Sequence, residues 1–134
     1  MARIRGSLDS AHCPVITIAV SASSGPSTFV DAVIDTGFTG FVQLPARTAQ
    51  ELGLTPRATS ETQYADGRID VIPLAWGQVT LRTAFQEGFV HIQRASDETI
   101  VGVEFLRLFR KTLVVSIADE IVLLIDSFAD LSAQ

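Results

Sequence analysis

The chain has 134 residues, of which 47% are apolar and 19% are charged, and this length predicts a single domain over residues 1–134. Its net charge of -5, without any basic run, argues against a nucleic-acid partner, because such binding draws on clustered positive charge. The longest uninterrupted apolar run, residues 121–125, is far shorter than the roughly 20 residues that cross a bilayer. The first residues also lack the apolar core of a signal peptide. We therefore expect a cytoplasmic protein with no membrane contact.

The first half of the chain predicts a hairpin followed by a short helix. Residues 13–22 are β-branched and extended, residues 23–27 form a turn cluster, and residues 28–35 alternate between apolar and polar side chains. After the sequence TGFTG, residues 41–44 predict a short strand. Pro45 suits the first position of a helix over residues 46–52, and Gly53 suits its C-terminal cap.

The second half predicts further strands and one amphipathic helix. Asp66-Gly67 lies between two extended arms within residues 59–76, which is a strong signal for a tight hairpin. Residues 76–81 and 85–92 predict two more strands, and residues 94–98 a loop. Ile100 and Val101 end a strand at Gly102. Residues 103–110 have the spacing of an amphipathic helix. Its apolar face has Phe105, Leu108 and Phe109, and its polar face has Glu104, Arg107 and Lys111.

The last two predicted strands, residues 112–117 and 121–126, are joined by Ala-Asp-Glu and form another hairpin. The sum is eight or nine short strands with one or two short helices. We therefore predict a mainly β protein with a closed or heavily twisted barrel-like sheet.

The stretch from Val33 to Pro45 contains the clearest candidate for a functional site. Asp35 ends an apolar strand and is followed by Thr36 and Gly37, and a carboxylate in such a place needs partners that hold its charge. The tripeptide has an ordinary alternative, in which the aspartate only caps a turn at the end of a strand. The motifs that follow it in the chain decide between the two.

Other polar and aromatic residues have ordinary interpretations. One cysteine and two histidines make a metal site improbable, and we expect neither a metal nor another cofactor. Cys13 is expected to be a small buried residue, His91 to be structural and Trp76 to pack in the core or an interface. Asp31 shares a strand face with Asp35, and we expect it to face solvent.

Three features occur in a fixed order: two apolar residues before Asp-Thr-Gly at residues 33–37, a glycine-tipped hairpin at residues 64–68, and Ile100-Val101-Gly102 before a short helix. Asp66 lies 31 residues after Asp35, and Gly102 lies 67 residues after it. In this order and spacing the sequence resembles the retropepsin-like aspartic proteases, the single-domain group that includes retroviral proteases and bacterial relatives. The resemblance covers roughly residues 12–125.

The resemblance implies half of an acid-protease fold that works as a homodimer on a polypeptide substrate. Peptide hydrolysis without metal needs one carboxylate as a base and a second, protonated one as an acid, and two such groups about 3 Å apart share one proton. With one Asp-Thr-Gly in the chain, Asp35 would meet Asp35 of a second copy.

The resemblance also assigns roles to the neighbouring residues. Thr36 would bond across the twofold axis, and Gly37 would offer its N–H to the carboxylates. Ile100-Val101-Gly102 would pack beneath the loop. The substrate-binding set would be Phe38 together with the flap residues Tyr64, Ala65, Asp66 and Gly67.

The sequence departs from the commoner pattern at Phe38, where many relatives have Ala, Ser or Thr, and is closest to a bacterial and archaeal subset with Asp-Thr-Gly-Phe. Phenylalanine cannot donate a hydrogen bond to the carboxylate, so the charged dyad has one stabiliser fewer unless Thr39 substitutes. Two rival interpretations remain: a catalytically inactive module of the same fold that dimerises and captures peptides by strand addition, and a small-ligand β-barrel. The second leaves Asp-Thr-Gly unexplained.

Overall fold

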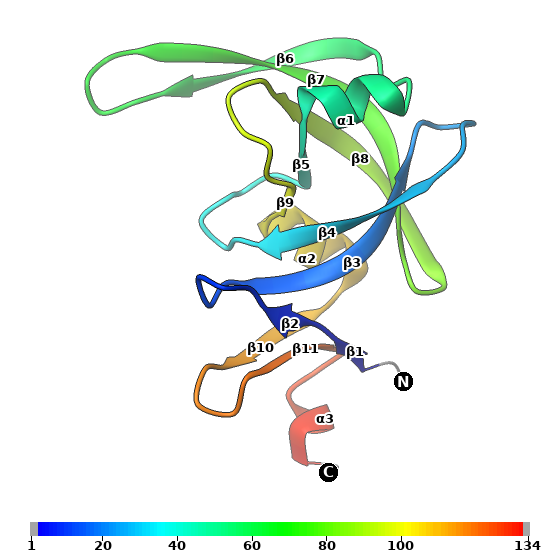
Figure 1. The fold of residues 1–134 in the computed structure, drawn as a ribbon, viewed down its shortest axis with the longest axis vertical. Helices are drawn as coiled ribbons and strands as arrows, with labels where there is room; N and C mark the ends of the chain where they lie inside the picture. The colour runs from blue at the N-terminus through cyan, green and yellow to red at the C-terminus, as the bar shows by residue number, and fades with distance from the viewer. Residues whose placement is uncertain (1–2, 133–134) are drawn as a thin grey trace.

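The protein, in a computed structural model that describes residues 3–132, consists mainly of β-strands with three short helices (Figure 1). The strands are β1 (Ile4–Arg5), β2 (Ser7–Leu8), β3 (Pro14–Ser21), β4 (Thr28–Ile34), β5 (Val42–Pro45), β6 (Pro56–Gln63), β7 (Ile69–Leu81), β8 (Ala84–Gln93), β9 (Ile100–Val101), β10 (Thr112–Ser116) and β11 (Ile121–Ile125). The helices are α1 (Ala46–Glu51), α2 (Val103–Phe109) and α3 (Ala129–Ser132).

The larger sheet closes on itself. Its eight strands have the order β2-β3-β4-β9-β5-β8-β7-β6, and β3 pairs a second time, with β7, through Ala19↔Thr80 and Val20↔Val79. This extra pairing joins the six strands from β3 to β7 into a barrel and leaves β2 and β6 outside it. The predicted closed, mainly β fold is therefore confirmed.

The sequence alternation explains why β3 lines the barrel. Ile16, Ile18 and Val20 are buried, at 2% exposure or less, whereas Thr17 between them is exposed and donates a hydrogen bond from its hydroxyl to Asp31 of β4 at 2.7 Å. Successive side chains of a strand point to opposite faces, so this pattern puts Ile16, Ile18 and Val20 in the core. The opposite face reaches water at Thr17, whereas Ala19 and Ser21 on that face are buried where β3 pairs with β7. Asp31 faces solvent, as its sequence position predicted.

The two-residue strand β9 fills the gap between β4 and β5. It runs parallel to β4, with Ile34 opposite Val101, and antiparallel to β5, with Val42 opposite Val101. Val101 is fully buried. The chain between β4 and β5, residues 35–41, must therefore pass around the end of β9, and this loop carries the Asp-Thr-Gly sequence.

Helix α2 packs beneath that loop through its aromatic face. Phe105 and Phe109 are buried and their ring centroids lie 4.8 Å apart, and the buried Phe41 ring stacks on Phe105 at 6.1 Å. The predicted helix therefore exists, but it ends at Phe109, and Lys111 lies beyond it, where its Nζ bonds the Asp126 carboxylate at 2.5 Å.

The smaller sheet has the order β1-β11-β10. Its central strand, β11, pairs with β10 along its whole length and with the two residues of β1, and four of its five residues are buried. The predicted hairpin of residues 112–126 is confirmed. Because β11 has partners on both edges, residues 121–125 belong to an ordinary core hairpin with β1 added.

The boundaries of β7 and of α1 also differ from the prediction. The predicted strand at residues 76–81 is not separate: β7 runs unbroken for 13 residues, from the hairpin turn to Leu81. Pro45 is the N-cap of α1 and the last residue of β5, so it precedes the helix. Gly53 does close the helix: it has φ 73°, and the amides of Gly53 and Leu54 donate to the carbonyls of Gln50 and Ala49.

None of the three helices of the described residues is long and apolar enough to cross a membrane. The cytoplasmic location and the single domain over residues 1–134 stay predictions.

The backbone of the Asp-Thr-Gly loop rests directly on Gly102, the residue after β9. A Cβ atom at Gly102 would lie 2.2 Å from the Phe38 carbonyl oxygen and 2.6 Å from that of Gly40. Both are backbone atoms, so a side chain at Gly102 has no room unless the loop itself moves.

Replacing Gly102 with alanine is expected to destabilise the protein by at least about 2 kcal/mol, because the added methyl group must displace backbone. Urea unfolding followed by circular dichroism measures the change. Gly25→Ala is the matched control: its Cβ would meet its nearest neighbour at 3.7 Å, an ordinary contact, so its midpoint should stay close to that of the wild type. Equal midpoints for all three proteins would contradict the proposed close contact.

Candidate functional site

Asp35 is the first residue after β4, and backbone hydrogen bonds hold it in place. Its amide donates to the carbonyl of Val101 at 2.9 Å, and its carbonyl accepts from the amide of Phe38 at 3.1 Å, which closes a tight turn. Inside that turn the Gly37 amide donates to the Asp35 carboxylate, with a distance of 2.8 Å to Oδ1. A charge-assisted bond of this kind favours the ionised form and fixes the direction of the side chain.

The rest of the loop is tied to the start of α2. The amides of Val103 and Glu104 donate to the carbonyls of Phe38 and Gly40, at 2.9 and 3.2 Å, and the amide of Gly102 donates to the carbonyl of Phe41 at 3.2 Å. The structure thus brings the predicted Ile100-Val101-Gly102 motif against the Asp-Thr-Gly loop.

The Asp35 side chain is exposed in this single chain, and so is Thr36. Within residues 3–132 the Asp35 carboxylate makes one hydrogen bond, to Gly37, and the hydroxyl of Thr36 makes none. Thr39, the predicted substitute donor, makes no side-chain hydrogen bond to Asp35 within the described residues. The carboxylate is therefore held from its own loop and is open on its outer side.

A largely apolar hollow of about 490 Å³ adjoins the carboxylate. Asp35 and Thr36 lie at it together with Glu98, and the remaining lining is apolar: Cys13, Pro14, Val33, Ile34, Ile100, Leu113 and Val115. Cys13 is partly buried, and extending the β3–β4 register by two positions from Val15↔Val33 places it opposite Asp35. The exposed side chains of Val115 and Ile117, at 39% and 52%, extend this apolar surface along the β10–β11 hairpin.

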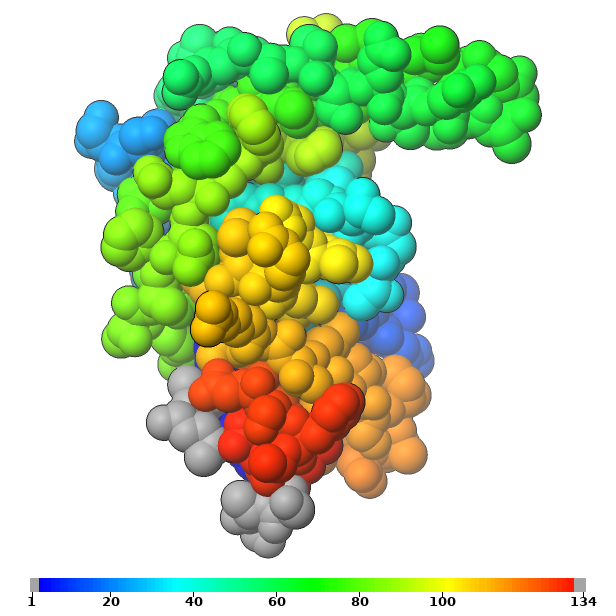
Figure 2. Space-filling view, turned by 180° about the vertical axis from the view of Figure 1, so that it is seen from behind, coloured from blue at the N-terminus to red at the C-terminus, as the bar shows by residue number. Residues whose placement is uncertain are grey.

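The predicted glycine-tipped hairpin is present as β6 and β7, which project from the barrel on the side where the Asp35 loop also lies (Figure 1). All residues from Glu61 to Val71 are exposed. Gly67 has φ 90°, and the amides of Tyr64 and Gly67 bond the carbonyls of Arg68 and Tyr64 across the turn. Viewed from behind, the hairpin overhangs open space (Figure 2).

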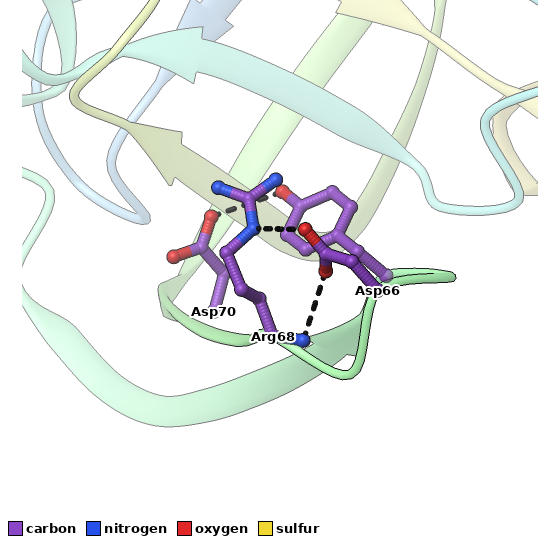
Figure 3. Close-up of polar contacts among 4 residues, drawn as sticks. Asp66, Arg68 and Asp70 are labelled. Carbon is purple, nitrogen blue, oxygen red and sulfur yellow. Dashed lines mark hydrogen bonds and ion pairs between the residues drawn. The ribbon is translucent and has the colours of Figure 1, made fainter.

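Polar side chains stiffen the hairpin tip (Figure 3). Asp66 accepts from both the backbone amide and Nε of Arg68 at 3.0 Å, the Arg68 guanidinium lies 4.7 Å from the Tyr64 ring centroid, and the Tyr64 hydroxyl donates to Asp70 at 2.9 Å. That hydrogen bond raises the pKa of the Tyr64 phenol. Tyr64 is therefore engaged with its own hairpin.

The β7 arm of the hairpin borders a hollow of about 450 Å³, between residues 70–73 and residues 92–95, which lie at and just after the end of β8. No hydrogen bond or ring contact joins the described residues of the tip to the Asp35 loop. The hairpin thus projects over accessible space. The roles of Tyr64, Ala65, Asp66 and Gly67 in binding a substrate stay predictions.

Phe38 packs under the loop, against a residue that the sequence did not connect with it. Its ring meets the ring of His91, on β8, edge to face, with 5.1 Å between centroids and an interplanar angle of 86°. Burial lowers the pKa of the His91 imidazole. In the sequence near Phe38, only Gly40 indicates that a ring packs closely here, and in the structure Gly40 and Gly102 both lie against Phe38. The partner ring, His91, lies 53 residues after Phe38 in the chain.

Trp76 does not pack in the core as expected: it is 36% exposed, and its ring meets that of Phe89 edge to face with 5.0 Å between centroids. A place for Trp76 in an interface stays a prediction. Among residues 3–132 no group of three or more His, Cys, Asp or Glu side chains is arranged to hold a metal ion.

Comparison with known proteins supports the fold. No protein-family model and no curated protein matches the sequence. Among solved structures, the chain is similar to a retropepsin-like aspartic protease from Rickettsia conorii, with a TM-score of 0.62 and 15% sequence identity, over 92% of this chain and 90% of that one. At such low identity the likeness shows the fold alone, and the chain has a retropepsin-like, mainly β fold.

Proposed function

We propose that the protein is an aspartic endopeptidase, of the Asp-Thr-Gly-Phe subset, that forms its catalytic dyad across a homodimer. The observation that carries the proposal is the Asp35 carboxylate, which is exposed, held at Oδ1 by the Gly37 amide and anchored through its own amide to Val101. Its place in a fold similar to that of a retropepsin-like aspartic protease supports the same conclusion.

The mechanism requires two carboxyl groups at one water molecule. One ionised Asp35 takes a proton from the water as it attacks the peptide carbonyl, and the protonated Asp35 of the partner gives a proton to the carbonyl oxygen. The resulting diol intermediate then collapses as the leaving amine is protonated. The Gly37 amide favours the ionised member of the pair, since it donates directly to the carboxylate.

The proposed dimer accounts for exposed features of the single chain. The hollow beside Asp35 is lined mainly by apolar side chains, and Val115 and Ile117 continue it. A second copy placed over this surface would remove apolar area from water and bring the two carboxylates together. It would also give the Thr36 hydroxyl a partner. In the same arrangement the β6–β7 hairpin would cover a polypeptide substrate that lies beneath it.

Asp35→Asn is expected to lower peptide cleavage by at least about a hundredfold, because neither subunit then has an ionisable carboxyl group at this position. The assay follows cleavage of denatured protein and of a peptide library between about pH 3 and pH 7, the range in which such dyads work. Asp31→Asn is the matched control, because Asp31 is exposed on β4 and bonds Thr17.

Equal cleavage by the wild type and Asp35→Asn would refute the proposal. Peptide binding that is unaffected by Asp35→Asn, without turnover at any pH, would favour the inactive peptide-binding module instead.

Thr36→Val is expected to weaken the dimer. Two symmetry-related hydrogen bonds would be lost, each contributing about 1 kcal/mol, so the dissociation constant should rise about tenfold or more. Sedimentation equilibrium of both proteins measures it. Thr55→Val, at another exposed threonine, controls for the loss of a hydroxyl and should dimerise like the wild type. A monomeric wild type at high concentration would contradict the dimer.

A further inference from the structure

The rings of Phe38 and His91 meet edge to face, and both lie directly against Gly40. A Cβ atom placed on Gly40 would lie 2.5 Å from Cζ of Phe38 and 2.8 Å from Nε2 of His91. The two rings and the Gly40 backbone thus form one packed unit, which joins the Asp35 loop to the barrel strand β8. We call these three residues the loop support.

The loop support is connected to the Asp35 carboxylate by short steps. The Phe38 amide bonds the Asp35 carbonyl, and its carbonyl accepts from Val103. Gly37, whose amide holds the carboxylate, lies between Asp35 and Phe38 in this turn. A shift of Phe38 would therefore move the one donor that orients the carboxylate.

His91 is a titratable side chain in direct contact with this loop, through the Phe38 ring. It is half-buried, and within residues 3–132 its side chain makes no hydrogen bond, so no protein group compensates for the desolvation of a charged ring in this position. Its strand neighbours across β5 and β7 are Gln43 and Leu74, which carry no charge.

The charged groups that share a hollow with His91 are Glu87 of β8 and Glu104 of α2. Glu104 is already paired with Arg107. From the loop, only the uncharged Thr39, Gly40 and Phe41 line the same hollow. A charged His91 is better hydrated when it turns into this open hollow than when it stays packed against the Phe38 ring.

We propose that His91 is a positioning residue for the Asp35 loop: its neutral ring holds Phe38, and protonation of the ring releases Phe38 and loosens the loop. This inference rests on the proposed function for its catalytic meaning. The proton comes from solvent, so no other reactant is needed. Burial lowers the pKa of His91, so the neutral, holding form extends below the usual range of histidine.

Hydrogen-exchange protection of the loop tests the inference without any need for activity. The relevant amides are those of Gly37, Phe38, Val103 and Glu104, which donate within the loop or to it. His91→Gln, which removes both the ring and its titration, is expected to lower their protection about two- to tenfold, the range that an aromatic pair supports, while the amides of β11 keep theirs. Phe38→Leu should lower the hydrogen-exchange protection of the same amides by a similar factor.

The pH response provides the second arm. Between about pH 7.5 and pH 4, wild-type protection of these amides should fall with the same midpoint as the NMR titration of the His91 ring. His91→Gln should show no such step. His12→Asn is the matched control: His12 is exposed, with φ 64°, a conformation that asparagine tolerates, and the variant should keep the wild-type response.

The kinetic arm separates this inference from the proposed function. In an active enzyme, His91→Gln should lower kcat about two- to tenfold with little change in KM, and should remove the limb of the pH profile that follows His91. A wild type that cleaves nothing would overturn the peptidase, while the protection data still decide the role of His91. Unchanged protection in both His91→Gln and Phe38→Leu, or a wild-type loop that ignores His91 titration, would overturn the inference.

Discussion

The insertion of β9 between β4 and β5 is the constraint on which the site depends. Two residues supply pairing to both neighbours, and the amides of Asp35, Gly102, Val103 and Glu104 all find carbonyl partners where the loop passes around the end of β9. Buried backbone groups must be paired, so the loop has little freedom to take another path. The absence of a side chain at Gly102 lets the loop backbone come close enough to make these bonds.

This constraint determines the position of Asp35, but it leaves the carboxylate accessible to a second group. The backbone fixes where Asp35 stands, and the Gly37 amide fixes how its carboxylate is directed, yet the outer side of that carboxylate is open. A single carboxylate of this kind can accept a proton but cannot at the same time supply one. In the proposed dimer, Asp35 supplies one half of the acid–base pair, and the apolar hollow beside it is part of the surface that the second copy would cover.

The sequence predicts those features whose cause is local. The extended stretch that forms β3, the Asp66-Gly67 turn and the closing glycine of α1 all follow from neighbouring residues. The short strands β1 and β2 and helix α3 were missed, since strands of two residues and a helix of four gain their stability from tertiary contacts. The same holds for the unbroken β7 and for His91, because pairing partners and packing partners distant in the chain decide them.

Phe38 shows how a loop can be held by packing where a hydroxyl would have held it by hydrogen bonds. A serine or threonine at this position would act on the carboxylate directly, whereas phenylalanine acts on the backbone that carries it, by filling the space between Gly40, Gly102 and His91. Packing of this kind is insensitive to charge as long as its partner is apolar, but here the partner is an imidazole. Under the proposed role of His91, this aromatic support makes the order of the loop depend on the charge of a base on a neighbouring strand.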